Sequence, residues 1–231
     1  MSQRSCLRPV GFLYKMINKI NIDNLTDPRD ARGRQWYMPT MIKAVLYGIM
    51  SGQKSLRQVE QTTEELSEST KKLLRIKKRL PDTTLRDFLV ALQADTVLTL
   101  LYRCVHQAIR RKSLSLATSY PIHVLAMDGK VVTPRFSDPA FTQRHHDANS
   151  KEHYELKTIT SCLISTPSKP CVGVSLVPPE ANEKGHFITA FKELLRVYGN
   201  KFFKIVTYDA GGNSLENATH VHKSRKFYFF L

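Results

Sequence analysis

Two aspartates stand at similar points of two apolar stretches. Asp128 lies within IHVLAMDGKVV (122–132), and Asp209 ends FKIVTYD (203–209). Because side chains alternate along a strand, each carboxylate shares a face with the residues two and four positions before it. If the two strands are adjacent and parallel, both carboxylates converge beside the carboxyl end of the second strand. That edge is where open α/β sheets usually place ligands.

Converging carboxylates repel each other unless a cation lies between them. Hard divalent cations such as Mg²⁺ or Mn²⁺ suit carboxylate oxygens and retain open positions for water and phosphate. Two such ions about 3.5–4 Å apart can activate an attacking oxygen and stabilise the leaving one in phosphodiester chemistry. Asp128 and Asp209 are therefore the candidate catalytic residues and the candidate metal ligands.

Each aspartate also has a simpler interpretation. An aspartate at a strand end before glycine is most often a turn residue. Taken alone, Asp128-Gly129 and Asp209-Ala210-Gly211 are weak motifs. Their corresponding positions in two strands of a strongly basic protein favour the catalytic interpretation.

The strands that would position these carboxylates belong to an alternating region after residue 120. Apolar patterning predicts strands at 122–132, 156–165, 171–178, 203–209 and 226–231, with helices at 186–198 and 214–224. Three consecutive strands followed by alternation predict a mixed sheet flanked by helices. Residues 138–153 are predicted to form a polar loop. Its His145, His146, Asp147 and His153 lack metal-ligand spacing.

The first half of the chain has helical periodicity instead. Pro39 opens one helical pattern, and Ser55 with Gln58 three residues later has capping-box spacing for the next. Further apolar stripes follow, so residues 39–112 are predicted to be all-helical. Two domains result, a helical basic domain at 1–120 and an α/β domain at 121–231, which makes the chain α+β as a whole.

The charge of the chain favours a polyanionic partner. Lys and Arg number 35 against 20 Asp and Glu, a formal net charge of +15. Residues 1–120 hold 21 of the basic side chains and 10 of the acidic ones. This excess is spread over several elements, which favours nucleic acid over a membrane surface. The four cysteines have no CxxC spacing, so neither a zinc ribbon nor a disulfide framework is expected.

Candidate DNA contacts lie in two stretches of the first half. AVLYGIMSGQKSLRQVEQ (44–61) is compatible with a helix-turn-helix, in which Arg57 meets DNA and Lys54 contacts phosphate. An ordinary helical hairpin explains the same pattern. KKLLRIKKR (71–79) is a denser basic run, either a solvated face or a phosphate-binding one. It holds Lys71, Lys72, Arg75, Lys77, Lys78 and Arg79. Lys130, close to Asp128, is a further candidate for holding a phosphate.

Several motifs agree in order and spacing with one family. LAMDGKVV (125–132), YELKTITSCLIS (154–165), PPEANEKGHF (178–187) and VTYDAGGNSLENA (206–218) resemble insertion-sequence DDE transposases. The helical region is similar to that family's N-terminal part, at MPTMIKAVLYGIMSGQKSLRQVEQTTEEL (38–66) and RLPDTTLRDFLVAL (79–92). The resemblance covers the chain from about residue 30.

The resemblance implies an RNase H-like catalytic domain in which Asp128 and Asp209 are the first two catalytic carboxylates. It implies metal-dependent chemistry with Mg²⁺ or Mn²⁺. Water cuts a DNA strand at the element's end, and the freed 3′-hydroxyl then attacks target DNA. The implied partner is double-stranded DNA, both element ends and target. Homo-oligomerisation and association with an intact transposase are open, as are the recognised sequences.

The sequence departs from the family at its end. The family uses a third carboxylate on a helix beyond the fifth strand, whereas this chain ends at Leu231 in the expected fifth strand. Glu155, Glu180 and Glu216 match no catalytic position, so no third acid is assigned. The expectation is a C-terminally truncated transposase with impaired activity. The alternative is a non-catalytic DNA-binding remnant or a regulator of an intact transposase.

The expected location is cytoplasmic and nucleoid-associated. Residues 1–20 lack the continuous apolar region and cleavage site of a signal peptide. No stretch approaches the roughly 18 consecutive apolar residues of a membrane span.

Overall fold

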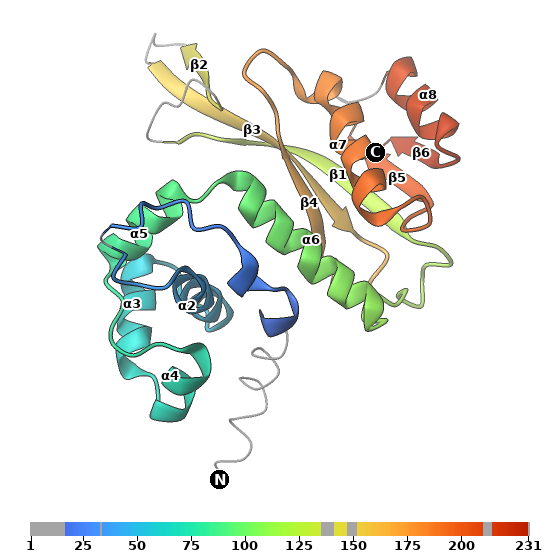
Figure 1. Cartoon of the computed structure of the whole chain (residues 1–231). Helices are drawn as coiled ribbons and strands as arrows, with labels where there is room; N and C mark the ends of the chain where they lie inside the picture. The colour runs from blue at the N-terminus through green and yellow to red at the C-terminus, as the bar shows by residue number, and fades with distance from the viewer. Residues whose placement is uncertain (1–16, 33, 135–140, 147–151, 210–213, 231) are drawn as a thin grey trace. The chain divides into compact units, whose positions relative to one another are not determined.

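The computed structural model describes residues 17–32, 34–134, 141–146, 152–209 and 214–230. The chain separates into two compact units, Met1–Gln107 and Ala108–Leu231. Figure 1 shows helices in the first unit and a sheet with helices in the second. The division falls between Gln107 and Ala108, whereas the sequence placed a domain boundary near residue 120. The predicted α/β fold class is confirmed.

The first unit is built from helices around one apolar core. Its elements are η1 Ile22–Asn24, α2 Met38–Met50, α3 Leu56–Glu65, α4 Glu68–Leu74, α5 Asp82–Ala91 and α6 Ala94–Arg110, the last of which crosses the division. Residues from all parts of this unit line the core, including the fully buried Met41, Leu74, Leu85 and Phe88. The prediction of helices from residue 39 to 112 holds, although it did not separate α4 from its neighbours.

The α2–α3 connection follows from three local features. The Ser55 hydroxyl accepts a hydrogen bond from the Gln58 amide at 3.2 Å, and the Gln58 side chain accepts one from the Lys54 amide at 2.7 Å. These bonds satisfy amides that a helix N-terminus leaves unpaired. Gly52 has a φ of 80°, a conformation that glycine adopts at little cost. Gly48 lies against Val59, where an added Cβ would come within 2.5 Å of a methyl carbon. The two helices can therefore pack closely only with glycine at position 48.

The second unit contains one mixed sheet. Its strands are β1 Val124–Val132, β2 Gln143–His146, β3 Glu152–Leu163, β4 Cys171–Leu176, β5 Ile205–Tyr208 and β6 Phe227–Phe230. They follow the order β2-β3-β1-β5-β6, and β4 also pairs with β3. The β1–β3, β2–β3 and β3–β4 pairs are antiparallel, whereas β1–β5 and β5–β6 are parallel. The three-strand meander and the later alternation predicted from sequence both appear.

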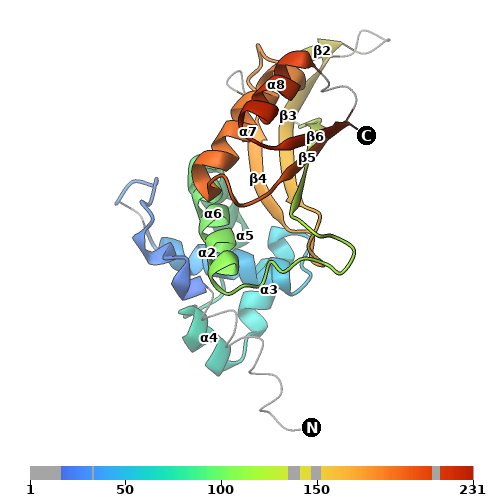
Figure 2. The same ribbon diagram turned by 90° about the vertical axis from the view of Figure 1, so that its right-hand side faces the viewer.

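Two helices cover this sheet. They are α7 Glu183–Tyr198 and α8 Leu215–Lys223, and Figure 2 shows them on the same side of the strands. Phe187 and Phe191 of α7 are buried, and their rings contact Tyr208, Tyr228 and Phe203. These aromatic contacts bury a large apolar area and fix α7 against β5 and β6.

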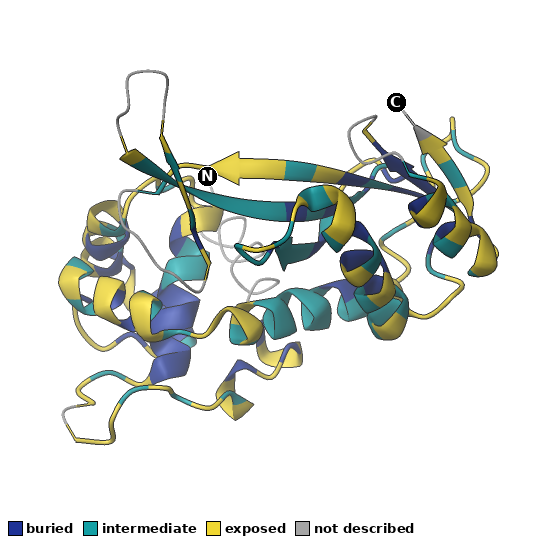
Figure 3. Ribbon diagram, turned by 90° about the horizontal axis from the view of Figure 1, so that it is seen from above, coloured by how far each residue is buried: buried dark blue, intermediate teal, exposed yellow. Residues whose placement is uncertain are grey.

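Burial changes along β1, the strand that carries the first aspartate. Val124, Leu125 and Met127 are buried, whereas the residues from Lys130 to Val132 are exposed. Figure 3 shows this change from dark blue to yellow along the strand. One end of β1 is therefore core, and the other end is surface on which a polar site can be built.

The predicted loop at 138–153 is wrong in part. Gln143–His146 forms β2 and pairs with Glu152–Glu155 at the start of β3. His145 and His153 are register partners with stacked rings 5.9 Å apart, and both contact Glu155. Pairing with β3 made a strand of residues whose polar composition indicated a loop. Asp147 lies outside the described residues.

Within the described part of the chain, no single helix is long and apolar enough to cross a membrane. Only α5 and α6 taken together meet the length and composition requirement, and they are bent by 93° relative to each other.

Candidate functional site

Asp128 and Asp209 are brought to one edge of the sheet by β1 and β5. These strands are adjacent and parallel, the arrangement on which the sequence interpretation depended. Their pairing runs through Ala126 and Thr207, each two residues before its aspartate. Because side chains repeat with a period of two, both aspartates belong to the same face of the sheet. Both are exposed, so solvent and ligands can reach them.

A third carboxylate, Glu183, comes to the same edge from the first residue of α7. The residue that allows its approach is Gly129. A Cβ added at Gly129 would lie 1.9 Å from Glu183 Oε2. Any side chain at position 129 would therefore have to displace this carboxylate. Glycine after Asp128 makes room for a further acidic group at this edge, on the face of β1 opposite to Asp128.

The beginning of α7 explains why Glu183 lies there. The Asn182 side chain accepts a hydrogen bond from the Gly185 amide at 2.7 Å and so caps the helix. Aspartate, asparagine and serine are favoured at this position because they satisfy a free helical amide. The sequence interpretation started this helix at residue 186 and so missed Glu183. The signal that could have found it was Asn182 followed directly by an acidic residue, a common helix start.

Partial burial raises the pKa of the Glu183 carboxyl above its usual value. The nearby ammonium of Lys157 acts in the opposite direction. The negative charges of Asp209 and Asp128 raise the pKa further. Each of the two aspartates is thus close enough to Glu183 to disfavour its ionisation. Such a concentration of negative charge is stabilised by a cation.

A pocket of about 440 Å³ opens beside these carboxylates. Glu183 and Asp209 line it together with Lys157, Lys184 and Tyr208, and Val131, Glu155 and Asn182 complete the wall. Asp128 does not line this pocket. The pocket therefore presents both acidic groups and two ammonium groups to a ligand, a combination suited to a metal-assisted reaction on an anionic substrate.

Tyr208 is a largely buried residue in the wall of this pocket. The residue is 2 % exposed, and its hydroxyl is buried with no hydrogen-bond partner among the described residues. Burial, with the negative charges of Glu183 and Asp209 adding, strongly raises the pKa of this phenol, so it stays protonated. A buried hydroxyl without a partner is costly.

The fit of these residues to a metal ion is incomplete. Within the described ranges, no three histidine, cysteine, aspartate or glutamate side chains form a group that could hold an ion. The available donors are carboxylate oxygens, the type that Mg²⁺ and Mn²⁺ prefer. Asp128 and Asp209 therefore suit such a cation in chemistry.

Lys130 lies two residues after Asp128 on the same face of β1 and is exposed. Its backbone carbonyl accepts a hydrogen bond from the Thr158 hydroxyl at 3.5 Å, which joins β1 to β3. The side chain is free to extend toward solvent near the carboxylate edge. Its position agrees with the predicted role in holding a phosphate, although no contact tests that role.

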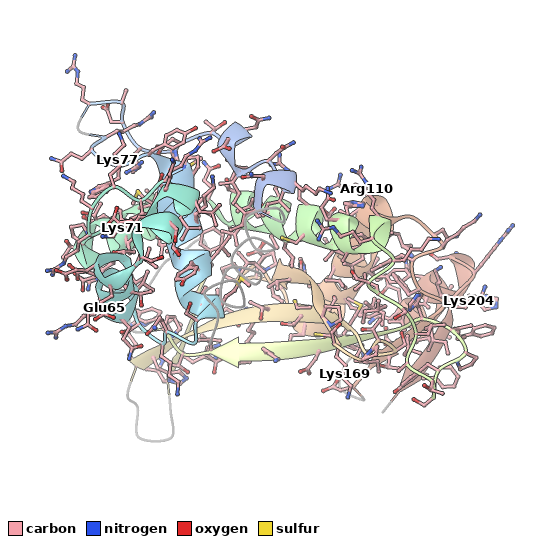
Figure 4. The ribbon with its side chains drawn as sticks, turned by 90° about the horizontal axis from the view of Figure 1, so that it is seen from below. Glu65, Lys71, Lys77, Arg110, Lys169 and Lys204 are labelled. Atoms are coloured by element: carbon pink, nitrogen blue, oxygen red, sulfur yellow. The ribbon has the colours of Figure 1, made fainter. Side chains whose placement is uncertain are left out.

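The candidate DNA contacts of the first unit are mostly exposed. Lys54 precedes α3 and Arg57 lies in its first turn, both at the surface. Lys72, Arg75, Lys77 and Lys78 are also exposed, and Figure 4 shows the side chains of Lys71 and Lys77 on this unit. The run from 71 to 79 is not one helix, since α4 ends at Leu74 and Arg75 has a φ of 59°.

Three of these basic side chains have partners within the first unit. Arg79 is paired with the buried Glu60 at 2.6 Å. Lys71 lies 3.1 Å from Glu68, and the Lys78 ammonium lies over the Trp36 ring at 5.0 Å. Glu60, with Glu64 and Asp82 adding, raises the pKa of Arg79 above its usual value. Arg79 therefore stabilises the α3 region, a role that a charge run in the sequence does not reveal.

Comparison of the chain with protein-family models and with curated proteins finds no match.

Proposed function

We propose that the chain is a transposase of the insertion-sequence DDE type, with an RNase H-like catalytic unit that cleaves and transfers DNA strands. The observation that carries the proposal is the adjacent parallel pairing of β1 and β5, in a register that places Asp128 and Asp209 together. The resemblance of the surrounding motifs assigns the same two residues to the catalytic positions.

Different residues at this edge can have different roles in strand cleavage. Asp128 and Asp209 would hold Mg²⁺ or Mn²⁺, which when bound would neutralise charge and activate an attacking oxygen. Lys157 and Lys184 line the pocket and attract the anionic phosphodiester. Such an enzyme would act at the nucleoid, on double-stranded DNA.

Glu183 supports the proposal in a further way. Its carboxylate lies over Gly129 and is influenced by both aspartates. It can accept a proton or add an oxygen donor at the same edge. The carboxylate edge thus has three acidic side chains, drawn from β1, α7 and the residue after β5.

A supercoiled plasmid tests the proposal directly. The full chain with Mg²⁺ or Mn²⁺ is expected to convert it to the nicked form, measured on agarose gels, and chelation is expected to stop the reaction. Asp128→Asn and Asp209→Asn keep the side-chain shape but remove the charge. Each is expected to abolish nicking while leaving DNA binding in a gel-shift assay. Glu216→Gln, an exposed carboxylate on α8, is the matched control and should nick normally.

A second candidate function is DNA binding without cleavage, as a remnant or regulator of an intact transposase. It is favoured by the absence, among the described residues, of a group of three metal-ligating side chains. Nicking by the wild type that persists unchanged in Asp128→Asn would reject the proposed site. Salt-sensitive DNA binding with no metal-dependent nicking would instead support the second function.

A further inference from the structure

A second pocket lies at the other end of the parallel strands. Its volume is about 660 Å³. Four basic side chains line it, those of Lys201, Lys204, Arg225 and Lys226, and among the described residues no acidic side chain does. His123 and Asn200 also contribute to the wall.

The topology of the sheet gathers these cations. His123 immediately precedes β1, Lys204 precedes β5 and Lys226 precedes β6. Because these three strands are parallel, their starts share one edge of the sheet. Asp209 follows the opposite end of β5, whose four residues span roughly 13 Å at 3.3 Å per residue. The cationic pocket is therefore separate from the carboxylate edge.

Lys226 is a buried cation without a carboxylate partner among the described residues. It is 4 % exposed, and its ammonium donates hydrogen bonds to the carbonyl oxygens of Phe203, at 2.7 Å, and of Asn200. It also lies over the Phe203 ring at 5.0 Å. Removing an ammonium from water is costly unless an opposite charge compensates. Carbonyl dipoles supply only part of that compensation, so the site favours an anion.

The other three cations that line the pocket are exposed at the surface. The Lys204 ammonium donates to the Arg225 carbonyl at 3.0 Å and lies 5.6 Å from the Phe227 ring (Figure 4 shows this side chain). Arg225 has a φ of 59°, so the backbone turns sharply there, directly before Lys226. None of the four forms an ion pair within the described part of the chain. Their positive charge is thus not neutralised by the chain's own described carboxylates.

We propose that this pocket binds a phosphate group of a DNA backbone, away from the strand that is cleaved. An arginine and several lysines around one cavity match the charge and hydrogen-bonding capacity of a phosphate. Contacts of this kind position DNA without reading its sequence. The inference rests on the proposed function in taking DNA as the source of the phosphate.

Fluorescence anisotropy with a labelled duplex of arbitrary sequence tests the inference on the full chain. Lys201→Gln, Lys204→Gln and Arg225→Gln are each expected to lower the slope of log affinity against log salt, and the triple variant should lower it by about 1, the share of one phosphate. The triple variant should bind roughly tenfold or more weakly at low salt. Lys192→Gln, an exposed lysine on α7 outside the pocket, should keep the wild-type slope. Lys201→Glu, a single change at an exposed position, provides a second variant, and thermal melting checks that each one folds.

Inorganic phosphate distinguishes a free anion from a DNA phosphate. At matched ionic strength, phosphate should displace the labelled duplex more than chloride does from the wild type, but not from the triple variant. If the triple variant binds the duplex with the affinity and salt slope of the wild type, the inference is overturned. This holds even if inorganic phosphate by itself binds in the pocket. Failure of the proposed function looks different, because the pocket variants change binding whereas Asp128→Asn changes nicking alone. A wild type that binds but does not nick would leave the phosphate pocket standing.

Discussion

The two ends of the parallel strands differ in charge: carboxylates and lysines mix at one end, whereas the pocket at the other is lined by basic side chains and by no acidic side chain among the described residues. At their carboxyl end lie Asp128, Asp209 and Glu183, whereas at their amino end lie four basic side chains around a pocket. Both groups are assembled by the same three strands and the connections between them. The difference shows how parallel pairing separates charged groups, since it places the starts of the paired strands at one edge and their ends at the other.

The largest effect is expected from a substitution in the apolar core that supports both ends of the strands. Phe187 is fully buried and contacts Phe191, Tyr208 and Tyr228. Phe187→Ala is expected to lower the free energy of unfolding by about 3–5 kcal/mol, measured by urea denaturation. The half-exposed Phe229 is the control, and Phe229→Ala should cost much less. Equal effects of the two variants would contradict the assigned core.

The carboxylate end can be broken alone by Asp209→Asn. Metal-dependent nicking is expected to fall roughly 100-fold or more, as when a group that stabilises transition-state charge is removed. The salt slope of DNA binding should stay at the wild-type value, because the cationic end is untouched. A variant that loses binding and nicking in proportion would show that the two ends do not act separately.

Gly129→Ala tests the role assigned to Glu183. The added methyl would lie 1.9 Å from Glu183 Oε2, and the flexible carboxylate must move away. We expect nicking to fall by about 10- to 100-fold, since small misplacements of a reacting group are costly. The melting temperature should change little, because a side-chain end can yield without moving the backbone. If the double variant Gly129→Ala/Glu183→Ala nicks DNA much more slowly than Glu183→Ala alone, the added methyl acts through some contact other than Glu183.

The smallest expected effect is a pH dependence of stability in the metal-free chain. Burial, with the charges of Asp209 and Asp128, raises the pKa of Glu183 in the folded state. The folded chain then binds this proton more tightly than the unfolded chain does. That stabilisation is present below the ordinary carboxyl pKa and is lost as the pH rises through the raised one.

Glu183→Gln removes this titration. It should melt slightly higher than the wild type at neutral pH, and the difference should vanish in acid. Differential scanning fluorimetry over a pH series measures the effect. A gap between the two melting temperatures that widens toward low pH would reverse the assigned sign.

The sequence predicted the carboxylates of the strands but not the carboxylate of the helix. Asp128 and Asp209 could be predicted because strand alternation and parallel pairing determine which residues share a face of the sheet. Glu183 depends on where α7 begins and on the space above Gly129, and the boundary of a helix is harder to predict than its existence. The strand β2 was missed for a similar reason, because its polar residues form a strand only through their pairing with β3.

The cationic pocket was also absent from the prediction. Lys201 and Lys204 lie before β5, whereas Arg225 and Lys226 lie before β6, and α8 separates the two pairs in sequence. Neither pair is dense enough to form a charge run. The basic run at 71–79 was conspicuous instead, yet Arg79 is paired with Glu60 there. Local charge density in a sequence says little about which charges fold together.

The pairing of β1 with β5 has a consequence for how the protein is made. Val124 and Ile205 are register partners although about 80 residues separate them along the chain, so this pair is a contact of high sequence separation. At about 5–20 residues per second, a ribosome needs roughly 4–16 s to extend the nascent chain from Val124 to Ile205. During that time the carboxylates of the site remain apart. The carboxylate edge is therefore incomplete while the second half of the chain is still being synthesised.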